Sequence, residues 1–299
     1  MMKKLLLILL FLPMIGFGQN VNIPDAIFKA YLVGNTAINT NGDTEIQVSE
    51  AAAFNDTIQC GWINISDLTG IEAFTALTSL NCGVSSLTSL DVSQNTALTS
   101  LNLGNNFVVN LDVSQNTALT FLDCRANQLT SLDLSGAIAL TYLDCGANSL
   151  TSLDVSNNTA LTTLWCDVNQ LTCLDISINT VLVYLNCSDN LLEQLNTRNG
   201  NYLNMSVESL NNNLTCVEVD NIGYANSNWL SSFDSFVTFN TNCNYTNPCA
   251  TVSAIQEHTT NKELIKVTDL LGRETKGTKN EILFYIYDDG TVEKIIIIE

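Results

Sequence analysis

The sequence predicts a β-rich repeat solenoid, in which small similar units stack along one axis instead of enclosing a single globular core. The first observation is a period of 21 residues, repeated in 98–118, 119–139, 140–160 and 161–181. The second is the alternation Leu101-Asn102-Leu103, which is typical of a half-buried strand. The third is the size of the unit: it cannot bury its leucines alone, so its neighbours must complete the core.

The repeat extends on both sides of these four units. Related units occupy 77–97 and 182–202, and a degenerate unit with Leu210, Asn213 and Cys216 closes the series. The common pattern, L-x-x-L-x-C-x-x-N-x-L-x-x-L-D-V-S-x-N-T-A, resembles the leucine-rich repeat. This resemblance implies a right-handed solenoid with a parallel concave sheet. A unit this short has no room for a full helix, so we expect turns or a second short strand around Leu-Asp-Val-Ser.

The segment at the start of the repeats narrows the resemblance. Ser66-Asp67-Leu68-Thr69-Gly70-Ile71-Glu72 resembles the opening repeats of internalin-type bacterial proteins. Proteins of that type are cell-surface binding proteins. The resemblance therefore implies a role in adhesion or recognition.

The N-terminus has the pattern of a secretory signal peptide covering residues 1–18. Two lysines precede an apolar run from Leu5 to Phe17, and Gly16-Phe17-Gly18 supplies small residues before a cut at Gln19. A membrane anchor is the alternative, but the run is too short to span a bilayer. We expect no transmembrane segment elsewhere.

Residues 19–54 are expected to form a helical N-terminal cap. An amphipathic helix should begin near Pro24. Residues 39–50 resemble an EF-hand calcium loop, with oxygen side chains at positions 1, 3 and 5 and a glutamate at position 12. The alternative is a helix–turn–helix in which Ser49 caps the second helix and the loop is only a turn. The resemblance implies calcium ligands at Asn39, Asn41, Asp43, Glu45 and Glu50.

Six cysteines occupy one column of the repeat: Cys60, Cys82, Cys124, Cys145, Cys166 and Cys187. Because Leu103 fills the same slot, we interpret the column as a stack of buried thiols. A metal ladder is the alternative, but it lacks the short ligand spacings that zinc sites prefer. A disulfide between Cys216 and Cys243 would staple the open end of the solenoid, although the sequence does not reveal connectivity. Cys173 takes a slot that holds serine in other units, so we expect it to be exposed.

Two polar columns are interpreted as scaffold. The asparagine column should bond backbone groups of the adjoining turns, and the acidic column should bond its own turns. Calcium along the acidic column is the less favoured alternative. The asparagines are Asn106, Asn127, Asn148, Asn169 and Asn190, and the acids are Asp91, Asp112, Asp133, Asp154 and Asp175.

The residues that alternate with the strand leucines are expected to face the concave surface. In the units from 119 to 202 these positions gather aromatic rings beside Arg and Asp, which is typical of a binding hot spot. Scattered surface aromatics are also ordinary in soluble proteins. The predicted partner-binding residues are Phe121, Asp123, Arg125, Tyr142, Asp144, Trp165, Asp167 and Tyr184.

The charge pattern limits the partners and the chemistry. The formal net charge is −19, and between residues 30 and 251 the only basic residues are Arg125 and Arg198. Such a surface repels nucleic acid and anionic lipid, and it favours cations, basic partners or neutral glycans. The only histidine, His258, lies outside the repeats, so a histidine-based triad is excluded there. We therefore predict a protein that is not an enzyme.

The last segment, 251–299, lacks the repeat and regains lysines. Residues 264–274 and 283–294 both read as alternating strands around turns. The Asp269-Leu270-Leu271-Gly272-Arg273 turn and the terminal strand pair resemble the C-terminal sorting domain of the type IX secretion system of Bacteroidota. This resemblance implies recognition by that machinery and passage across the outer membrane. The alternative is a small β-module that the mature protein retains.

These patterns divide the chain into signal peptide 1–18, N-terminal cap 19–54, about seven repeats with a closing unit in 55–220, C-terminal cap and linker 221–250, and sorting domain 251–299. The predicted function is adhesion or recognition by a secreted or outer-surface protein, through a protein or glycan partner on the concave face. The alternative is a calcium-stabilised structural component of the surface or matrix without a discrete ligand.

Overall fold

The computed structural model describes residues 19–245, 249, 264–268, 282–287 and 292–296. The chain divides into two compact units, Met1–Thr251 and Val252–Glu299. The predicted signal peptide and most of the predicted sorting domain, including its Asp269–Arg273 turn, lie outside the described residues. Across the described part of the chain, the structure contains no helix of the length and apolarity needed to cross a membrane.

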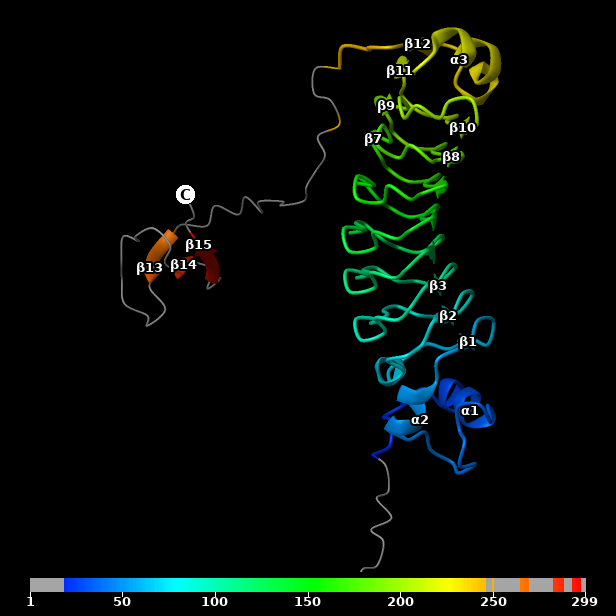
Figure 1. The fold of residues 1–299 in the computed structure, drawn as a ribbon, viewed down its shortest axis with the longest axis vertical. Coiled ribbons are helices and arrows are strands. Elements are labelled where there is room, and N and C mark those ends of the chain that lie inside the picture. The colour runs from blue at the N-terminus through cyan, green and yellow to red at the C-terminus, as the bar shows by residue number, and fades with distance from the viewer. Residues whose placement is uncertain (1–18, 246–248, 250–263, 269–281, 288–291, 297–299) are drawn as a thin grey trace, which may run out of the picture. The chain divides into compact units, whose positions relative to one another are not determined.

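Two short helices form the N-terminal cap (Figure 1). Helix α1 (Ala26–Gly34) begins two residues after Pro24, because the side chain of Asp25 accepts hydrogen bonds from the first-turn N–H groups and acts as the N-cap. Helix α2 (Val48–Ala53) is capped by Gln47. The expectation that Ser49 caps this helix is wrong: Ser49 lies inside the first turn, and Glu50 accepts a hydrogen bond from the backbone N–H of Gln47 instead.

The repeats build one parallel sheet along the solenoid (Figure 1). Successive strands pair in register, so equivalent repeat positions lie side by side, as Leu122 and Leu143 do. The central leucine of these strands is fully buried in β2 to β6. A short 3-10 turn, η1 (Ile71–Ala73), follows the first strand. The sheet order is β1 (Thr57–Gln59), β2 (Ser79–Asn81), β3 (Ser100–Asn102), β4 (Phe121–Asp123), β5 (Tyr142–Asp144), β6 (Thr163–Trp165), β8 (Tyr184–Asn186) and β10 (Ser206–Glu208).

A second, four-stranded sheet forms on the other limb of the later repeats (Figure 1). Its order is β12 (Thr238–Asn240), β11 (Cys216–Glu218), β9 (Gln194–Asn196) and β7 (Cys173–Asp175). In earlier units the same positions form no strand apart from one isolated bridge between Asp112 and Asp133, and turns follow them, as at Ser114-Gln115. Turns and a second short strand, the two arrangements that we expected around Leu-Asp-Val-Ser, therefore both occur, in different repeats. Helix α3 (Ile222–Asn228) and the 3-10 turn η2 (Leu230–Ser232) belong to the C-terminal cap.

The cysteine column is a stack of free, buried thiols. All six side chains are at most 1% exposed, as is Leu103 in the same column. Burial raises the pKa of these thiols, to about 12 for Cys60 and Cys187. Among the described residues no group of three or more His, Cys, Asp or Glu side chains is arranged to hold a metal ion.

Two asparagine columns join neighbouring repeats. In the predicted column, Asn169 Oδ1 accepts a hydrogen bond from Leu150 N at 2.9 Å, and its amide donates to Cys145 O at 3.0 Å. The closing member of this column is Asn212, which accepts from Leu192 N at 3.1 Å, so the assignment of Asn213 to it is wrong. A second column was not predicted from the sequence, and its buried amides donate to carbonyls of the preceding unit: Asn95, Asn116, Asn158 and Asn179.

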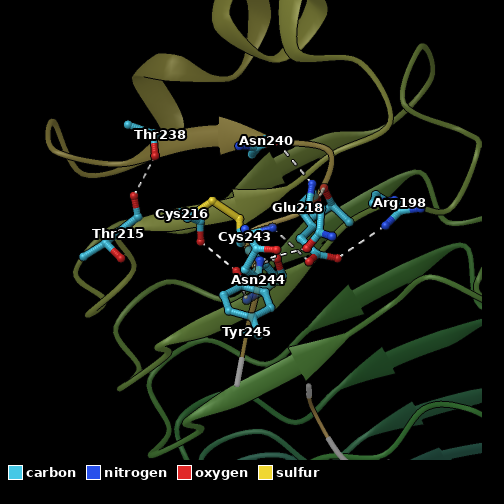
Figure 2. Close-up of a disulfide and its surroundings, with 12 residues drawn as sticks. Arg198, Thr215, Cys216, Glu218, Thr238, Asn240, Cys243, Asn244 and Tyr245 are labelled. Atoms are coloured by element: carbon cyan, nitrogen blue, oxygen red, sulfur yellow. Dashed lines mark hydrogen bonds and ion pairs between the residues drawn. A yellow bond between two sulfur atoms is a disulfide. The ribbon is translucent and has the colours of Figure 1, made fainter. Parts of the chain in front are cut away.

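The four cysteines outside the column form two disulfides on the second sheet. Cys216, the first residue of β11, is joined to Cys243, as Figure 2 shows. Cys173, the first residue of β7, is joined to Cys249. Cys173 is therefore partly buried and bonded, and the expectation of an exposed thiol is wrong. Between the two disulfides, the Tyr245 hydroxyl donates to Cys216 O at 2.7 Å.

The second compact unit contains a three-stranded antiparallel sheet in the order β13 (Leu264–Thr268), β14 (Ile282–Tyr287) and β15 (Val292–Ile296). These strands lie in the two segments in which the sequence predicts strands. The central strand β14 pairs Phe284 with Lys294 on one side and with Thr268 on the other.

Candidate partner-binding face

The side chains that flank the buried leucines form the outer surface of the eight-stranded sheet, which we call the strand face. Three rings make a continuous row on it. Phe121 and Tyr142 are cross-strand neighbours and stack with ring centroids 4.6 Å apart and 9° between the planes. Tyr142 reaches diagonally to Trp165, with centroids 6.0 Å apart. Trp165 is 39% exposed and Tyr184 is 56% exposed, so apolar ring surface lies open to solvent.

Two carboxylates lie beneath this surface rather than on it. The side chains of Asp123 and Asp144, which were predicted as partner-binding residues of the concave surface, are only 7% and 3% exposed. Arg125 lies over both, with Nε 3.7 Å from Asp123 Oδ2 and Nη1 3.7 Å from Asp144 Oδ2. Asp144 Oδ1 accepts a hydrogen bond from Gly146 N at 3.0 Å.

Burial governs the protonation of this face. It raises the pKa of Asp144 to about 6, and the neighbouring carboxylates of Asp123 and Asp167 add to the rise. Burial also raises the pKa of Asp123 and of Asp167. Burial, together with the nearby Asp144 and Asp123, raises the pKa of Tyr142 to about 12. Positive charge placed against these carboxylates would therefore favour their ionised form.

A pocket of about 460 Å³ opens beside the aromatic row. Five of the eight predicted residues line it: Arg125, Asp144, Trp165, Asp167 and Tyr184. The other three lie outside it: Phe121 and Tyr142 form the adjoining ring stack, and Asp123 lies under Arg125.

Part of the pocket wall was not predicted from the sequence. Asn186, Ser206 and Glu208 contribute to the lining from β8 and β10. Glu208 could have been found only by aligning β10 with β8, and the 22-residue step between them breaks the regular period. The aromatic residues of the site, in contrast, could be found in the sequence from their positions in the repeat columns.

The EF-hand-like loop is closed by hydrogen bonds to Glu50. Its Oε1 accepts from Thr40 N at 2.8 Å and from Asn41 N at 3.1 Å, while Oε2 accepts from Gln47 N at 3.1 Å. Burial opposes ionisation of Glu50, but these hydrogen bonds together lower its pKa. The carboxylate therefore ties the loop to the start of α2.

The other predicted calcium ligands also have partners within the protein. Glu45 pairs with Lys29 at 2.7 Å. Asn39 Oδ1 accepts from Gly42 N at 3.1 Å, and Asp43 Oδ1 accepts from Glu45 N at 2.7 Å. Asn41 donates to Asp43 Oδ2 at 3.0 Å. The set of oxygens suits calcium chemically, but a cation would have to displace several of these hydrogen bonds.

A second, polar pocket of about 440 Å³ lies at the C-terminal disulfides. Glu218, Asn244 and Tyr245 contribute to its lining, and all three are labelled in Figure 2. Arg198 pairs with Glu218 across 3.6 Å. Because Cys249 also lines this pocket, its walls depend on the disulfide to Cys173.

The fold has clear structural counterparts. No protein-family profile matches the sequence, and no curated protein matches it. The functional domain of InlJ from Listeria monocytogenes, which includes a cysteine ladder, is 34% identical over 68% of this chain and 52% of its own length, with a TM-score of 0.56. The chain thus spans about half of that domain.

Two further similar structures are internalins of the same organism. Internalin C2 is 20% identical, over 67% of this chain and 97% of its own, with a TM-score of 0.44. InlF is 19% identical, over 73% of this chain and 68% of its own, with a TM-score of 0.48.

The predicted fold class is confirmed. The repeats together form a leucine-rich repeat solenoid with a parallel sheet, similar to the InlJ domain.

Proposed function

We propose that this protein is a recognition protein that binds a protein partner on its strand face. The observation that carries the proposal is the open aromatic row of Phe121, Tyr142 and Trp165 beside a lined pocket. Clustered rings next to charged groups are the composition of interface hot spots. The strands that carry the aromatic row, β4, β5 and β6, are also held by paired strands on both sides, which keeps this part of the strand face rigid.

The double variant Tyr142→Ala with Trp165→Ala is expected to lose partner capture by about a hundredfold or more, because hot-spot rings each contribute about 2 kcal/mol or more. The measurement is capture of the mature protein on host-cell, bacterial and glycan surfaces. Phe107→Ala is the matched control, since Phe107 is 51% exposed and lies outside the aromatic row. Unchanged capture by the double variant would favour the structural-component alternative.

We further propose that the protein acts outside the cell or on the outer surface. The supports are the signal-peptide pattern of 1–18 and the sorting-domain resemblance of 251–299. In this route the type IX machinery recognises the tail. Export to the medium by a chain truncated after Cys249 would contradict that role of the tail.

Calcium binding by residues 39–50 is a separate proposal, which rests on the EF-hand resemblance and on the oxygen donors gathered in the loop. Titration calorimetry of the mature protein with calcium is expected to give binding heat that Glu50→Gln abolishes, because the final glutamate supplies two ligand oxygens. Glu72→Gln serves as the control, since Glu72 lies in η1 outside the loop. If the unaltered protein gives no binding heat, the proposal that this loop binds calcium is contradicted.

A further inference from the structure

We propose that the pocket beside Trp165 receives a basic side chain, lysine or arginine, from the partner protein. This inference rests on the proposed function, because it names the chemistry that the strand face recognises. Four features of the pocket support it: its charge, an Asp144 oxygen that has no hydrogen bond, its ring walls and its open floor.

The pocket is acidic even though Arg125 lines it. Asp144, Asp167 and Glu208 contribute three carboxylates. The guanidinium of Arg125 is shared with Asp123, which lies outside the pocket, at the same 3.7 Å distance as Asp144. Negative charge is therefore left in excess, and the net charge of −19 strengthens attraction for a basic partner.

Asp144 retains an oxygen without a hydrogen bond. Its side chain is only 3% exposed, and Oδ1 accepts from Gly146 N. Among the described residues no group donates a hydrogen bond to Oδ2, and Arg125 Nη1 at 3.7 Å is too distant to do so. Oδ2 is not among the fully buried polar atoms that lack a partner, so it can be reached from the pocket. An ammonium or guanidinium group entering the pocket would supply the absent donor.

The walls suit the stem and the charge of such a side chain. Trp165 and Tyr184 are both open to solvent and line the pocket, so their rings can cover methylene groups and face a cation. A ring face attracts a cation within about 6 Å of its centroid. Acidic groups beside aromatic rings form a better environment for a cation than for a neutral sugar, which would leave the carboxylates uncompensated.

Gly146 keeps the floor between the carboxylates open. A Cβ atom at this position would lie 3.0 Å from Asp167 Oδ1 and 3.3 Å from Asp144 Oδ1. Both distances are closer than ordinary carbon–oxygen contacts, so any side chain would crowd the two acids. Glycine thus leaves both carboxylates accessible from the pocket.

The test is selection of a phage library of random peptides on the mature full-length protein, followed by affinity measurement of the selected peptides. Selected peptides are expected to share one lysine or arginine. Replacing that residue by norleucine should weaken binding by about tenfold or more, and raising the salt concentration should weaken it as well.

The protein variants are Asp144→Asn and the pair Asp167→Asn with Glu208→Gln. Each is expected to lower affinity for the selected peptides about tenfold or more. Asp144→Asn keeps an oxygen for Gly146 N and removes a buried charge, so the variant should remain folded. Asp154→Asn is the matched control, because it makes the same charge change at a residue outside the pocket.

The outcomes separate this inference from the proposed function. Peptides that require Tyr142 and Trp165, but that carry no shared basic residue and bind Asp144→Asn normally, would overturn the basic-side-chain inference alone. Selection of neutral glycans in place of peptides, on a glycan array, would also overturn it. Peptides whose affinity is unchanged by every substitution on the strand face would contradict both the basic-side-chain inference and the proposed function.

Discussion

Replacing the cysteines of each disulfide by serine is expected to destabilise the protein strongly. The chain-entropy relation predicts a loss of about 3.5 kcal/mol for Cys216→Ser with Cys243→Ser, whose bond spans 27 residues. For Cys173→Ser with Cys249→Ser, whose bond spans 76 residues, it predicts about 4.5 kcal/mol. Both bonds anchor the segment after β12 to the second sheet. In the double serine variants, the last repeats should therefore be the first part of the solenoid to unfold.

Guanidinium unfolding of the unreduced protein and of the two double variants measures these losses. The quadruple serine variant is the control: a reductant should not destabilise it further, because its remaining six cysteines are free thiols. Thiol titration checks the pairing. Six groups should react in denaturant alone and all ten cysteines after reduction. Equal unfolding midpoints for the unaltered protein and both double variants would contradict a stabilising role.

Asn169→Ala is expected to lower the free energy of unfolding by about 2–3 kcal/mol. The Asn169 side chain is buried, accepts from Leu150 N at 2.9 Å and donates to Cys145 O at 3.0 Å and Cys166 O at 3.2 Å. Alanine would leave Leu150 N buried without a partner, at a cost of about 1–3 kcal/mol, and would remove one of the bonds that Cys145 O and Cys166 O accept, since these carbonyls also accept from Asn148 and Asn190. Because they belong to two successive repeats, the loss also weakens the interface between the repeats.

The measurement is again equilibrium unfolding, here with Asn110→Ala as the matched control. Asn110 is exposed and makes no side-chain hydrogen bond within the described residues, so its change should stay within about 0.5 kcal/mol. A loss for Asn169→Ala no larger than that of the control would contradict the scaffold role of the asparagine column.

The repeat columns were predictable because each one is a local pattern with a single physical meaning. Leu101 and its counterparts had to be buried, since a short strand has only one inward face. A slot that accepts both Cys145 and Leu103 had to be apolar. Asn169 followed from the same logic, because a fixed polar residue inside a stack needs fixed backbone partners.

Where the period ends, prediction from sequence was less accurate. The structure assigns Asn212, not Asn213, to the asparagine column, because the unit after Asn190 has an irregular length. At α2, the glutamate at the third helical position made Gln47 the cap, although serine is the commoner cap residue. In both cases tertiary contacts decided between neighbouring residues that a local pattern ranks almost equally.

In the candidate site, too, some features could be predicted from the sequence and others depended on tertiary contacts. The aromatic positions Phe121, Tyr142 and Trp165 were visible as interruptions of regular columns, and the structure brings them into one row. The burial of Asp144 was not visible, because it depends on Arg125 of the preceding unit lying over it. Exposure of a strand residue depends on the sizes of its neighbours on both sides, which alternation alone does not encode.

The sequence by itself determined the stack, its buried columns and the side of the strands that turns away from the core, because a period repeats the same local environment in every unit. Only the tertiary structure decided the pairing of Cys173 with Cys249 and the meeting of Asp144 with Glu208 at one pocket. Both depend on the path of chain beyond the regular repeats. A non-repeating segment has no neighbour of the same pattern to specify where it lies, so its position follows from packing as a whole.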